Sequence, residues 1–146
     1  MREAKKFTIK RVTRADGKTL AGFKKLLAEW SSKKYPVTAK YYSKLFEKSV
    51  VLVAYDNGEM VGMVTLVPMH KLSGLKGSLE HLMVQEKYRG QGLGKQLVQA
   101  AIGEAKKLKI TSLFLTVEPD RLIAQGLYKK LGFKKQDTQF YQLKIT

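Results

Sequence analysis

Residues 84–95 read Val-Gln-Glu-Lys-Tyr-Arg-Gly-Gln-Gly-Leu-Gly-Lys, with three glycines between a strand pattern and a helical pattern. Glycine lets a backbone approach a ligand closely, because no side chain stands in the way. The first N–H groups of the following helix lack helical partners, and the helix dipole favours an anion there by ~0.3–1 kcal/mol. The stretch therefore predicts a phosphate cradle. A tight loop without a ligand is the alternative, and it costs backbone entropy at each glycine.

Two familiar nucleotide-binding loops do not fit this stretch. A P-loop requires glycine at position 89 and Ser or Thr at position 96, where the chain has Arg89 and Gln96. A dinucleotide-binding fingerprint requires a further glycine at position 95, which is Lys95. The cradle therefore belongs to another kind of phosphate-binding site.

Outward from the glycines, hydrophobic periodicity predicts interleaved strands and helices. Asn57-Gly58 stands between two apolar runs and predicts a type I′ hairpin, since both residues tolerate positive φ. The segment 69–77 has two glycines and is interpreted as a loop, and the second helix should bury Tyr41, Leu45 and Phe46. We expect seven strands, at 7–13, 50–55, 60–67, 78–84, 111–117, 133–135 and 139–145. We expect four helices. The first follows a Thr13-x-x-Asp16 capping box, the second starts at Thr38, and the others cover 93–108 and 121–131.

This order of elements predicts a single domain over residues 1–146 of α/β class and α+β type. We expect a mixed, mostly antiparallel sheet of about 6–7 strands, with about four helices covering both faces. The chain has no cysteine, which excludes disulfides and a thiolate nucleophile. We expect no metal.

Two segments of the chain resemble the signatures of the GNAT superfamily of N-acetyltransferases. The first, with three glycines, is similar to that family's acetyl-CoA pyrophosphate loop, whose pattern is Gln/Arg-x-x-Gly-x-Gly/Ala. The second follows later in the chain, in the order the family has. One departure is Arg121, where many members have Asn, and it bears on the acceptor-side contacts of that Asn. The two segments read Val84-x-x-x-Tyr88-Arg89-Gly90-Gln91-Gly92-Leu93-Gly94 and Ala124-x-x-Leu127-Tyr128-x-Lys130-x-Gly132-Phe133.

The resemblance implies where acetyl-CoA, the cosubstrate, would bind. Two central strands should splay apart, with the pantetheine arm along the strand that ends at Val84 and the pyrophosphate on the amides of 91–95. A backbone N–H near Leu82 or Met83 should stabilise the oxyanion. The residues expected at the cofactor are Leu82, Met83, Val84, Arg89, Gly90, Gln91, Gly92, Leu93, Gly94, Lys95, Arg121 and Ala124.

Glu80 is the expected general base, acting through a water. Strict alternation along 78–84 would place it on one face with Ser78, Leu82 and Val84, the face that meets the acceptor in many family members. His81 would then lie on the opposite face in a packed or surface role. A strand carboxylate that merely pairs with a lysine is the alternative for Glu80.

Tyr128 is the expected general acid. It matches the tyrosine of the second signature, which in many members reaches the sulfur of CoA. A phenol with a pKa of ~10 can return a proton to a departing thiolate. The alternative is a helix tyrosine packed at the edge of the core.

The formal charge of +16 could indicate a polyanionic partner such as a nucleic acid or only a basic, solvated surface. Only five of the 28 basic residues are arginine, and the lysines are spread along the chain, which favours a solvated surface over a nucleic-acid interface. No apolar run is long enough for a membrane span or follows the N-terminus as in a signal peptide, so we expect no membrane partner and a cytoplasmic location. Besides acetyl-CoA, we expect an unidentified amine acceptor and either a monomer or a homodimer.

These observations together predict an N-acetyltransferase that moves an acetyl group from acetyl-CoA to a primary amine of a small molecule or protein. The amine would attack directly in a ternary complex, because no acyl-enzyme nucleophile stands out. A catalytically silent CoA-binding sensor is the first alternative. A basic nucleic-acid-binding protein is the second, and it leaves both signatures unexplained.

Overall fold

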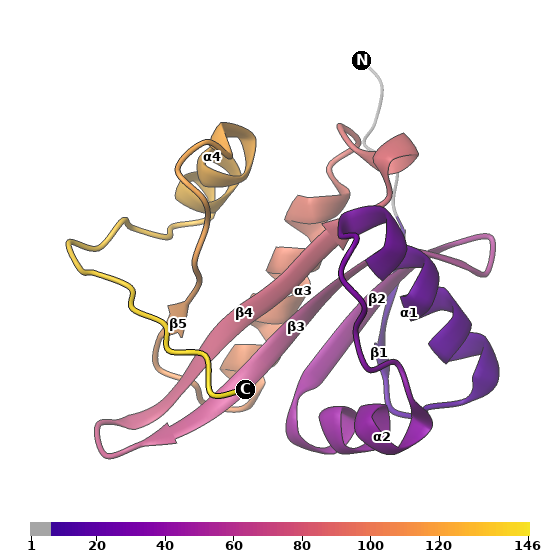
Figure 1. The fold of residues 1–146 in the computed structure, drawn as a ribbon. Coiled ribbons are helices and arrows are strands. Elements are labelled where there is room, and N and C mark those ends of the chain that lie inside the picture. The colour runs from indigo at the N-terminus through magenta and orange to yellow at the C-terminus, as the bar shows by residue number, and fades with distance from the viewer. Residues whose placement is uncertain (1–6) are drawn as a thin grey trace. The chain divides into compact units, whose positions relative to one another are not determined.

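The computed structural model describes residues 7–146, which form two compact units that meet between Leu115 and Thr116. In the first unit, five strands pair in the order β1-β2-β3-β4-β5 (Figure 1). All neighbours are antiparallel except the parallel pair β4–β5. The expected mixed, mostly antiparallel sheet is confirmed, with five strands in place of about 6–7. The strands are Thr8–Val12, Val50–Asp56, Glu59–Lys71, Gly74–Val84 and Leu113–Phe114.

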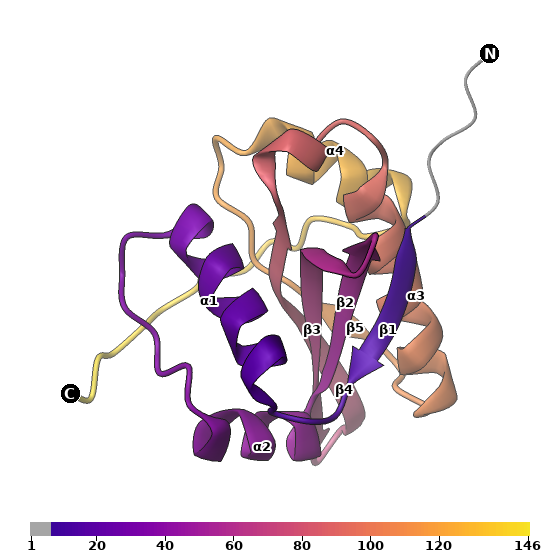
Figure 2. The same ribbon diagram turned by 90° about the vertical axis from the view of Figure 1, so that its right-hand side faces the viewer.

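Helices cover both faces of this sheet, as expected. Figure 2 shows α1 (Gly17–Trp30) on one side and α3 (Leu93–Lys107) on the other, with α2 (Ala39–Lys48) on the side of α1. A short 3₁₀ helix, η1 (Glu86–Tyr88), follows β4. The helix expected from 93 to 108 is α3, and one stripe of its apolar residues is buried, whereas its C-cap Leu108 is exposed. The buried residues of the stripe are Leu93, Leu97, Val98, Ala101 and Ala105.

Side-chain caps fix where the first two helices begin. Asp16 caps α1 by accepting a hydrogen bond from the Thr19 N–H at 2.9 Å. The expected capping box led by Thr13 is therefore wrong, because its fourth residue is itself the N-cap. Thr38 caps α2 as predicted, by accepting from the Tyr41 N–H at 3.2 Å. In α2 the buried tyrosine is Tyr42, so the expected burial of Tyr41 is wrong by one position.

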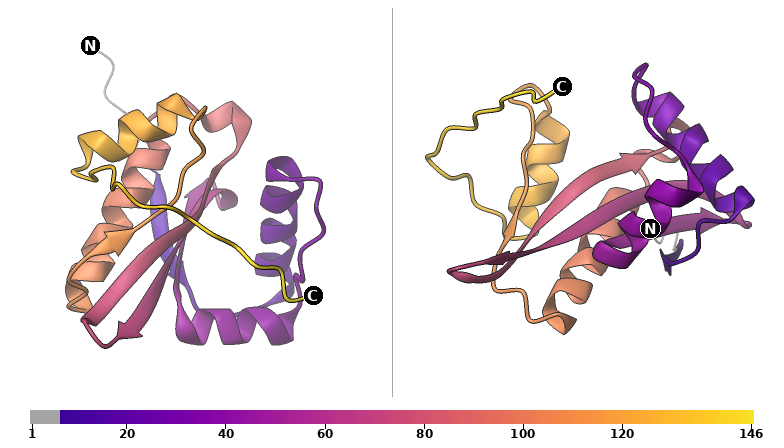
Figure 3. Two further views of the ribbon diagram at one scale, coloured as in Figure 1. Left: turned by 60° about the vertical axis from the view of Figure 1, so that its left-hand side comes forward. Right: turned by 60° about the horizontal axis from the view of Figure 1, so that its bottom comes forward.

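Two hairpins join β2, β3 and β4. Asn57 and Gly58 have φ of 51° and 80°, which confirms the type I′ turn. The loop expected at 69–77 is wrong, because β3 and β4 stay paired out to Lys71 and Gly74 (Figure 3). Only one of the two glycines that suggested a loop lies at the turn, since Gly77 is inside β4.

The second unit contains α4 (Leu122–Lys130), which ends where glycine was expected. Gly132 has a φ of 97°, and its N–H donates to the Lys129 carbonyl at 3.1 Å. The Phe133 N–H donates to the Tyr128 carbonyl at 3.0 Å, which completes a Schellman cap.

Three strand predictions near the C-terminus do not hold. Residues 133–135 and 139–145 form no strand, although their apolar residues suit one, because no neighbouring strand pairs with them. The strand expected at 111–117 shrinks to β5. None of the helices described in residues 7–146 has the length and apolar character needed to cross a membrane.

Candidate acetyl-CoA and acceptor site

The glycine turn before α3 has the geometry of an anion cradle. Gly90 and Gly92 have φ of 77° and 80°, in the left-handed region that favours glycine. A Cβ built on either residue meets no atom within 4 Å, so the turn faces open space. Gly92 is the N-cap of α3, and in the described chain no side chain caps this helix. The N–H groups of residues 93–95 precede the first intrahelical bond, from the Gln96 N–H to the Gly92 carbonyl.

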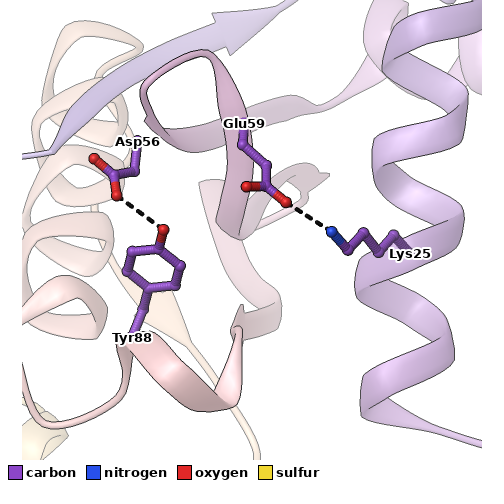
Figure 4. Close-up of polar contacts among 4 residues, drawn as sticks. All are labelled: Lys25, Asp56, Glu59 and Tyr88. Carbon is purple, nitrogen blue, oxygen red and sulfur yellow. Dashed lines mark hydrogen bonds and ion pairs between the residues drawn. The ribbon is translucent and has the colours of Figure 1, made fainter.

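Neighbouring side chains anchor the turn and leave its glycine backbone free for a ligand. The Tyr88 hydroxyl donates to Asp56 Oδ2 at 2.8 Å, which ties the start of the turn to the β2–β3 hairpin (Figure 4). This hydrogen bond to a carboxylate, together with desolvation, raises the pKa of Tyr88. Arg89 Nε donates to the Val84 carbonyl and Gln91 Nε2 to the Lys87 carbonyl, both at 3.2 Å.

The hairpin that holds Tyr88 is itself fixed to α1. Lys25 Nζ lies 2.6 Å from Glu59 Oε1 (Figure 4). Both side chains are exposed, so this ion pair positions the hairpin more than it stabilises the fold. The turn before α3 is thus connected through Tyr88 and the hairpin to the helix on the other face of the sheet.

Only the backbone of Leu93 is available to a ligand at the turn. Its side chain is 1% exposed and packs under the turn. Gly62 makes room for it, because a Cβ there would lie 3.2 Å from Leu93 Cδ2 and 3.1 Å from the Met83 carbonyl oxygen. Any contact of Leu93 with a phosphate therefore comes from its N–H.

The outer edge of β4 provides room for an extended ligand arm. Its parallel partner β5 pairs only with Gly77 and Ser78. Beyond Ser78, no strand within residues 7–115 pairs with this edge. The backbone groups near Leu82 and Val84 lie on this edge, where the resemblance predicts the pantetheine arm.

A β-bulge at His81 overturns the alternation expected along β4. Residue pairs between β3 and β4 step from Thr65↔Glu80 to Met63↔Met83, so β4 has one residue more than β3. His81 has a φ of 51°. Directly paired residues share a face, so Glu80 lies on the α1 side with Met83. The prediction that Glu80 shares its face with Val84 is wrong, because Val84 pairs with Gly62 on the α3 side.

Glu80 is exposed on the α1 side of the sheet, opposite the buried Thr65. Within the described residues it makes no ion pair and no side-chain hydrogen bond, so the lysine pairing considered as its alternative role is not observed. Its carboxylate is therefore available to a ligand.

His81 does not point away from α1, as strict alternation required. Its ring makes an edge-to-face contact with Trp30 at 5.6 Å between centroids, at the last residue of α1. The bulge thus turns His81 toward the same helix that Glu80 faces.

Tyr128, Arg121 and Ala124 belong to the second unit. The Tyr128 ring contacts Phe133 edge to face at 5.8 Å, the hydrophobic contact of the Schellman cap. Burial raises the pKa of the Tyr128 phenol, and the charge of Arg121 opposes that shift. The group is therefore a protonated donor at neutral pH. Arg121 is the N-cap of α4 without a side-chain capping bond, and Ala124 is half-buried in its first turn.

Sequence reasoning missed a second set of residues beside Glu80. Trp30 contacts Tyr35 at 6.0 Å as well as His81, and it is 39% exposed. Trp30 continues the helical spacing of the apolar residues of α1, and that spacing does not mark it as a site residue. Next to it lies a cavity of about 10 Å³, whose lining includes Glu29 and Gln85. The signal for this group was the only tryptophan of the chain, at a helix end rather than mid-helix.

Comparison with known proteins shows which proteins the chain resembles. The sequence profile described as the Acetyltransferase (GNAT) family matches residues 19–133. The chain is similar to the L-methionine sulfoximine/L-methionine sulfone acetyltransferase of Pseudomonas aeruginosa, with 34% identity over 86 residues, 58% of this chain and 50% of that protein. It is also similar to human N-acetyltransferase 8B, with 32% identity over 109 residues, 73% of this chain and 47% of that protein. The chain thus spans about half the length of the curated relatives it matches.

Among solved structures, the fold is similar to that of glucosamine-6-phosphate N-acetyltransferase from Arabidopsis thaliana. The TM-score is 0.77 at 20% identity, over 95% of this chain and 99% of that one. At this identity the likeness concerns the fold alone. The matched profile begins in α1, runs through the glycine turn and ends at Phe133, so it includes both signatures.

Proposed function

This chain belongs to the Acetyltransferase (GNAT) family, and on that premise we propose that it transfers an acetyl group from acetyl-CoA to a primary amine. The observation that carries the proposal is the turn at Gly90 and Gly92, whose left-handed backbone faces open space directly before α3. Its N–H groups point along the helix axis, where an anion is favoured. The residues present therefore fit a pyrophosphate.

The first unit provides a binding surface in two parts. The amides of residues 93–95 would bind the pyrophosphate, and the edge of β4 beyond Ser78, which pairs with no strand of residues 7–115, would bind the arm that carries the thioester. Arg89 is exposed beside the turn, and Lys95 lies in the first turn of α3, so both can add positive charge near the phosphates. The acetyl-CoA supplies the acetyl group, and the thiol of CoA leaves.

Glu80 is the proposed base for the amine. At neutral pH a primary amine is protonated, since its pKa is ~10, and it must lose that proton before attack. Glu80 faces the α1 side, is exposed and makes no ion pair with any residue from 7 to 146, so it can take the proton through a water. The amine nitrogen then forms a bond to the acetyl carbon while the carbon–sulfur bond breaks.

Tyr128 is the proposed donor of the proton that the leaving sulfur takes up. Its buried phenol stays protonated at neutral pH, because burial raises its pKa. A backbone N–H near Leu82 or Met83 would donate to the carbonyl oxygen while charge develops on it. The nitrogen gives up two protons in all: one passes to Glu80 and then to solvent, and the second, lost after attack, replaces through solvent the proton that Tyr128 gives to the sulfur.

The test is release of free CoA thiol from acetyl-CoA across a panel of primary amines. We expect turnover by the wild type and at least a 100-fold lower kcat for Glu80→Gln, in the range that loss of a general base produces. The matched control is Glu47→Gln on the exposed surface of α2, which should keep the wild-type rate. Both variants should retain the rise in melting temperature that CoA produces.

Two results would contradict this proposal. A wild-type rate in Glu80→Gln would remove that residue from the chemistry. CoA binding without turnover of any amine would favour the silent sensor instead.

A further inference from the structure

Three aromatic side chains from different parts of the first unit meet at the end of α1, and one of them, His81, directly follows Glu80 in β4. Trp30 ends α1, Tyr35 lies in the segment before α2, and His81 is the bulge residue of β4. The Trp30 ring contacts the other two at centroid distances of 6.0 and 5.6 Å. We call these three residues the aromatic wall. They are not enclosed, because Trp30 is 39% exposed and His81 is exposed, so the wall faces solvent.

The backbone indicates that the wall has a role beyond packing. His81 adopts a left-handed conformation that non-glycine residues rarely take. Bulges re-aim side chains and are frequent beside active sites, where strain is retained for function. Here the bulge directs the ring of His81 to Trp30. Its neighbour Glu80 stays on the α1 side of the sheet.

The cavity next to Trp30 is lined by the carboxylate of Glu29, the amide of Gln85 and the guanidinium of Arg89. Glu29 precedes Trp30 in α1, and its carboxylate accepts a hydrogen bond from the Glu86 N–H. Gln85 is 4% exposed, and its Oε1 has no hydrogen-bond partner among the described residues. It lines the cavity of about 10 Å³ next to Trp30. A cavity of this size holds at most one water, so a larger ligand would lie on the wall itself.

An exposed aromatic surface beside a carboxylate suits one kind of amine substrate. Aromatic faces attract cations and stack with other rings, and carboxylates such as Glu80 attract an ammonium group. A polyhydroxylated amine would gain less from the wall than an aryl amine, because it has no aromatic ring to pair with the rings there.

We propose that the aromatic wall binds the apolar or aromatic part of the acceptor and directs its ammonium group to Glu80. The acceptors are thus primary amines that carry an aryl or bulky apolar group a few bonds from the nitrogen. This inference rests on the proposed function, because it names the substrate class of the same site.

Trp30 is the only tryptophan in the chain, so its fluorescence reports on the wall directly. With CoA present, we would titrate the protein with phenethylamine, glucosamine and spermidine in turn. Phenethylamine should change the emission in a saturable way at a concentration at least tenfold lower than either other amine. This measurement needs no turnover, so it separates the binding surface from the chemistry.

Turnover with two variants completes the test. Trp30→Ala should raise the KM for phenethylamine about tenfold, the effect of losing a ring contact, with kcat little changed. His81→Asn keeps a residue that tolerates positive φ and should raise the KM in the same direction. The control Tyr41→Ala removes an aromatic ring that is 56% exposed on α2 and should change neither constant.

The outcomes distinguish the two proposals. A saturable fluorescence change with phenethylamine but no acetylation of any amine supports the wall and contradicts the proposed function. The proposal for the wall is overturned if amines are acetylated but glucosamine or spermidine changes the fluorescence at the same or a lower concentration than phenethylamine. An unchanged KM in both Trp30→Ala and His81→Asn also overturns it, as does the absence of any response to phenethylamine.

Discussion

Replacing Gly92 by glutamate should abolish CoA binding while leaving the fold intact. A Cβ at this position meets no atom within 4 Å, so the only structural cost is the left-handed backbone at φ 80°. That cost is about 1–2 kcal/mol for a residue with a side chain. At roughly 3 °C per kcal/mol for a domain of this size, the variant should melt about 3–6 °C below the wild type.

The loss of ligand stabilisation should exceed this structural effect. CoA at 100 times its Kd adds ~2.7 kcal/mol to the wild type, or about 8 °C. A carboxylate about 4 Å from one phosphate charge repels it by about 4 kcal/mol at an effective dielectric constant of 20. The repulsion is larger than the gain, so differential scanning fluorimetry should show no CoA-dependent rise for Gly92→Glu.

Gly58→Glu is a matched control for the backbone and the added charge. Gly58 also has a φ of 80° and also has open space around its Cβ position, but it lies in the β2–β3 hairpin. This variant should melt as low as Gly92→Glu and still show the full CoA-dependent rise. An undiminished rise in Gly92→Glu would refute the reasoning, since the diphosphate would then bind elsewhere.

Three further changes test the surroundings of the site. Tyr88→Phe removes the 2.8 Å hydrogen bond to Asp56 and should weaken CoA binding in a calorimetric titration; equal affinity would show that the bond does not position the turn. Leu97→Ala opens a cavity at a fully buried position of α3 and should cost about 2–5 kcal/mol in urea unfolding, so a cost under about 1 kcal/mol would contradict the packing described. Burial raises the pKa of Tyr42 and of Tyr55, so the folded state holds these protons more tightly and stability should fall as pH rises above about 10; Tyr42→Phe should lessen that fall in melting curves from about pH 9 to about pH 11.

Features encoded by a few neighbouring residues could be predicted from the sequence. Asn57-Gly58 sets its own turn, and Gly132 ends α4, because each conformation depends on local backbone freedom. The buried stripe of α3 followed from its period. The glycine turn of the candidate site could be predicted in the same way, because its conformation depends only on Gly90, Gly92 and the helix that follows.

The rest depended on contacts between distant residues. The bulge at His81 exists because β4 has one residue more than its partner over a short span, and the sequence of β4 alone carries no sign of this. The face of Val84 was therefore assigned wrongly. In the same way, the apolar residues in 139–145 suit a strand, but a strand also requires a neighbour to pair with. Helical spacing alone cannot show that Trp30, the last residue of α1, is partly exposed.

The bulge has a consequence for changes in chain length. Without His81, residues 80, 82, 83 and 84 would pair in order with 65, 64, 63 and 62, so a one-residue deletion would give a regular ladder. Met83 would keep its place in the hydrophobic cluster, and Val84 would keep its face. We therefore expect a protein without His81 to fold normally. Selection for activity, and not for stability, would then remove such a deletion, so the extra residue of β4 is explained by function.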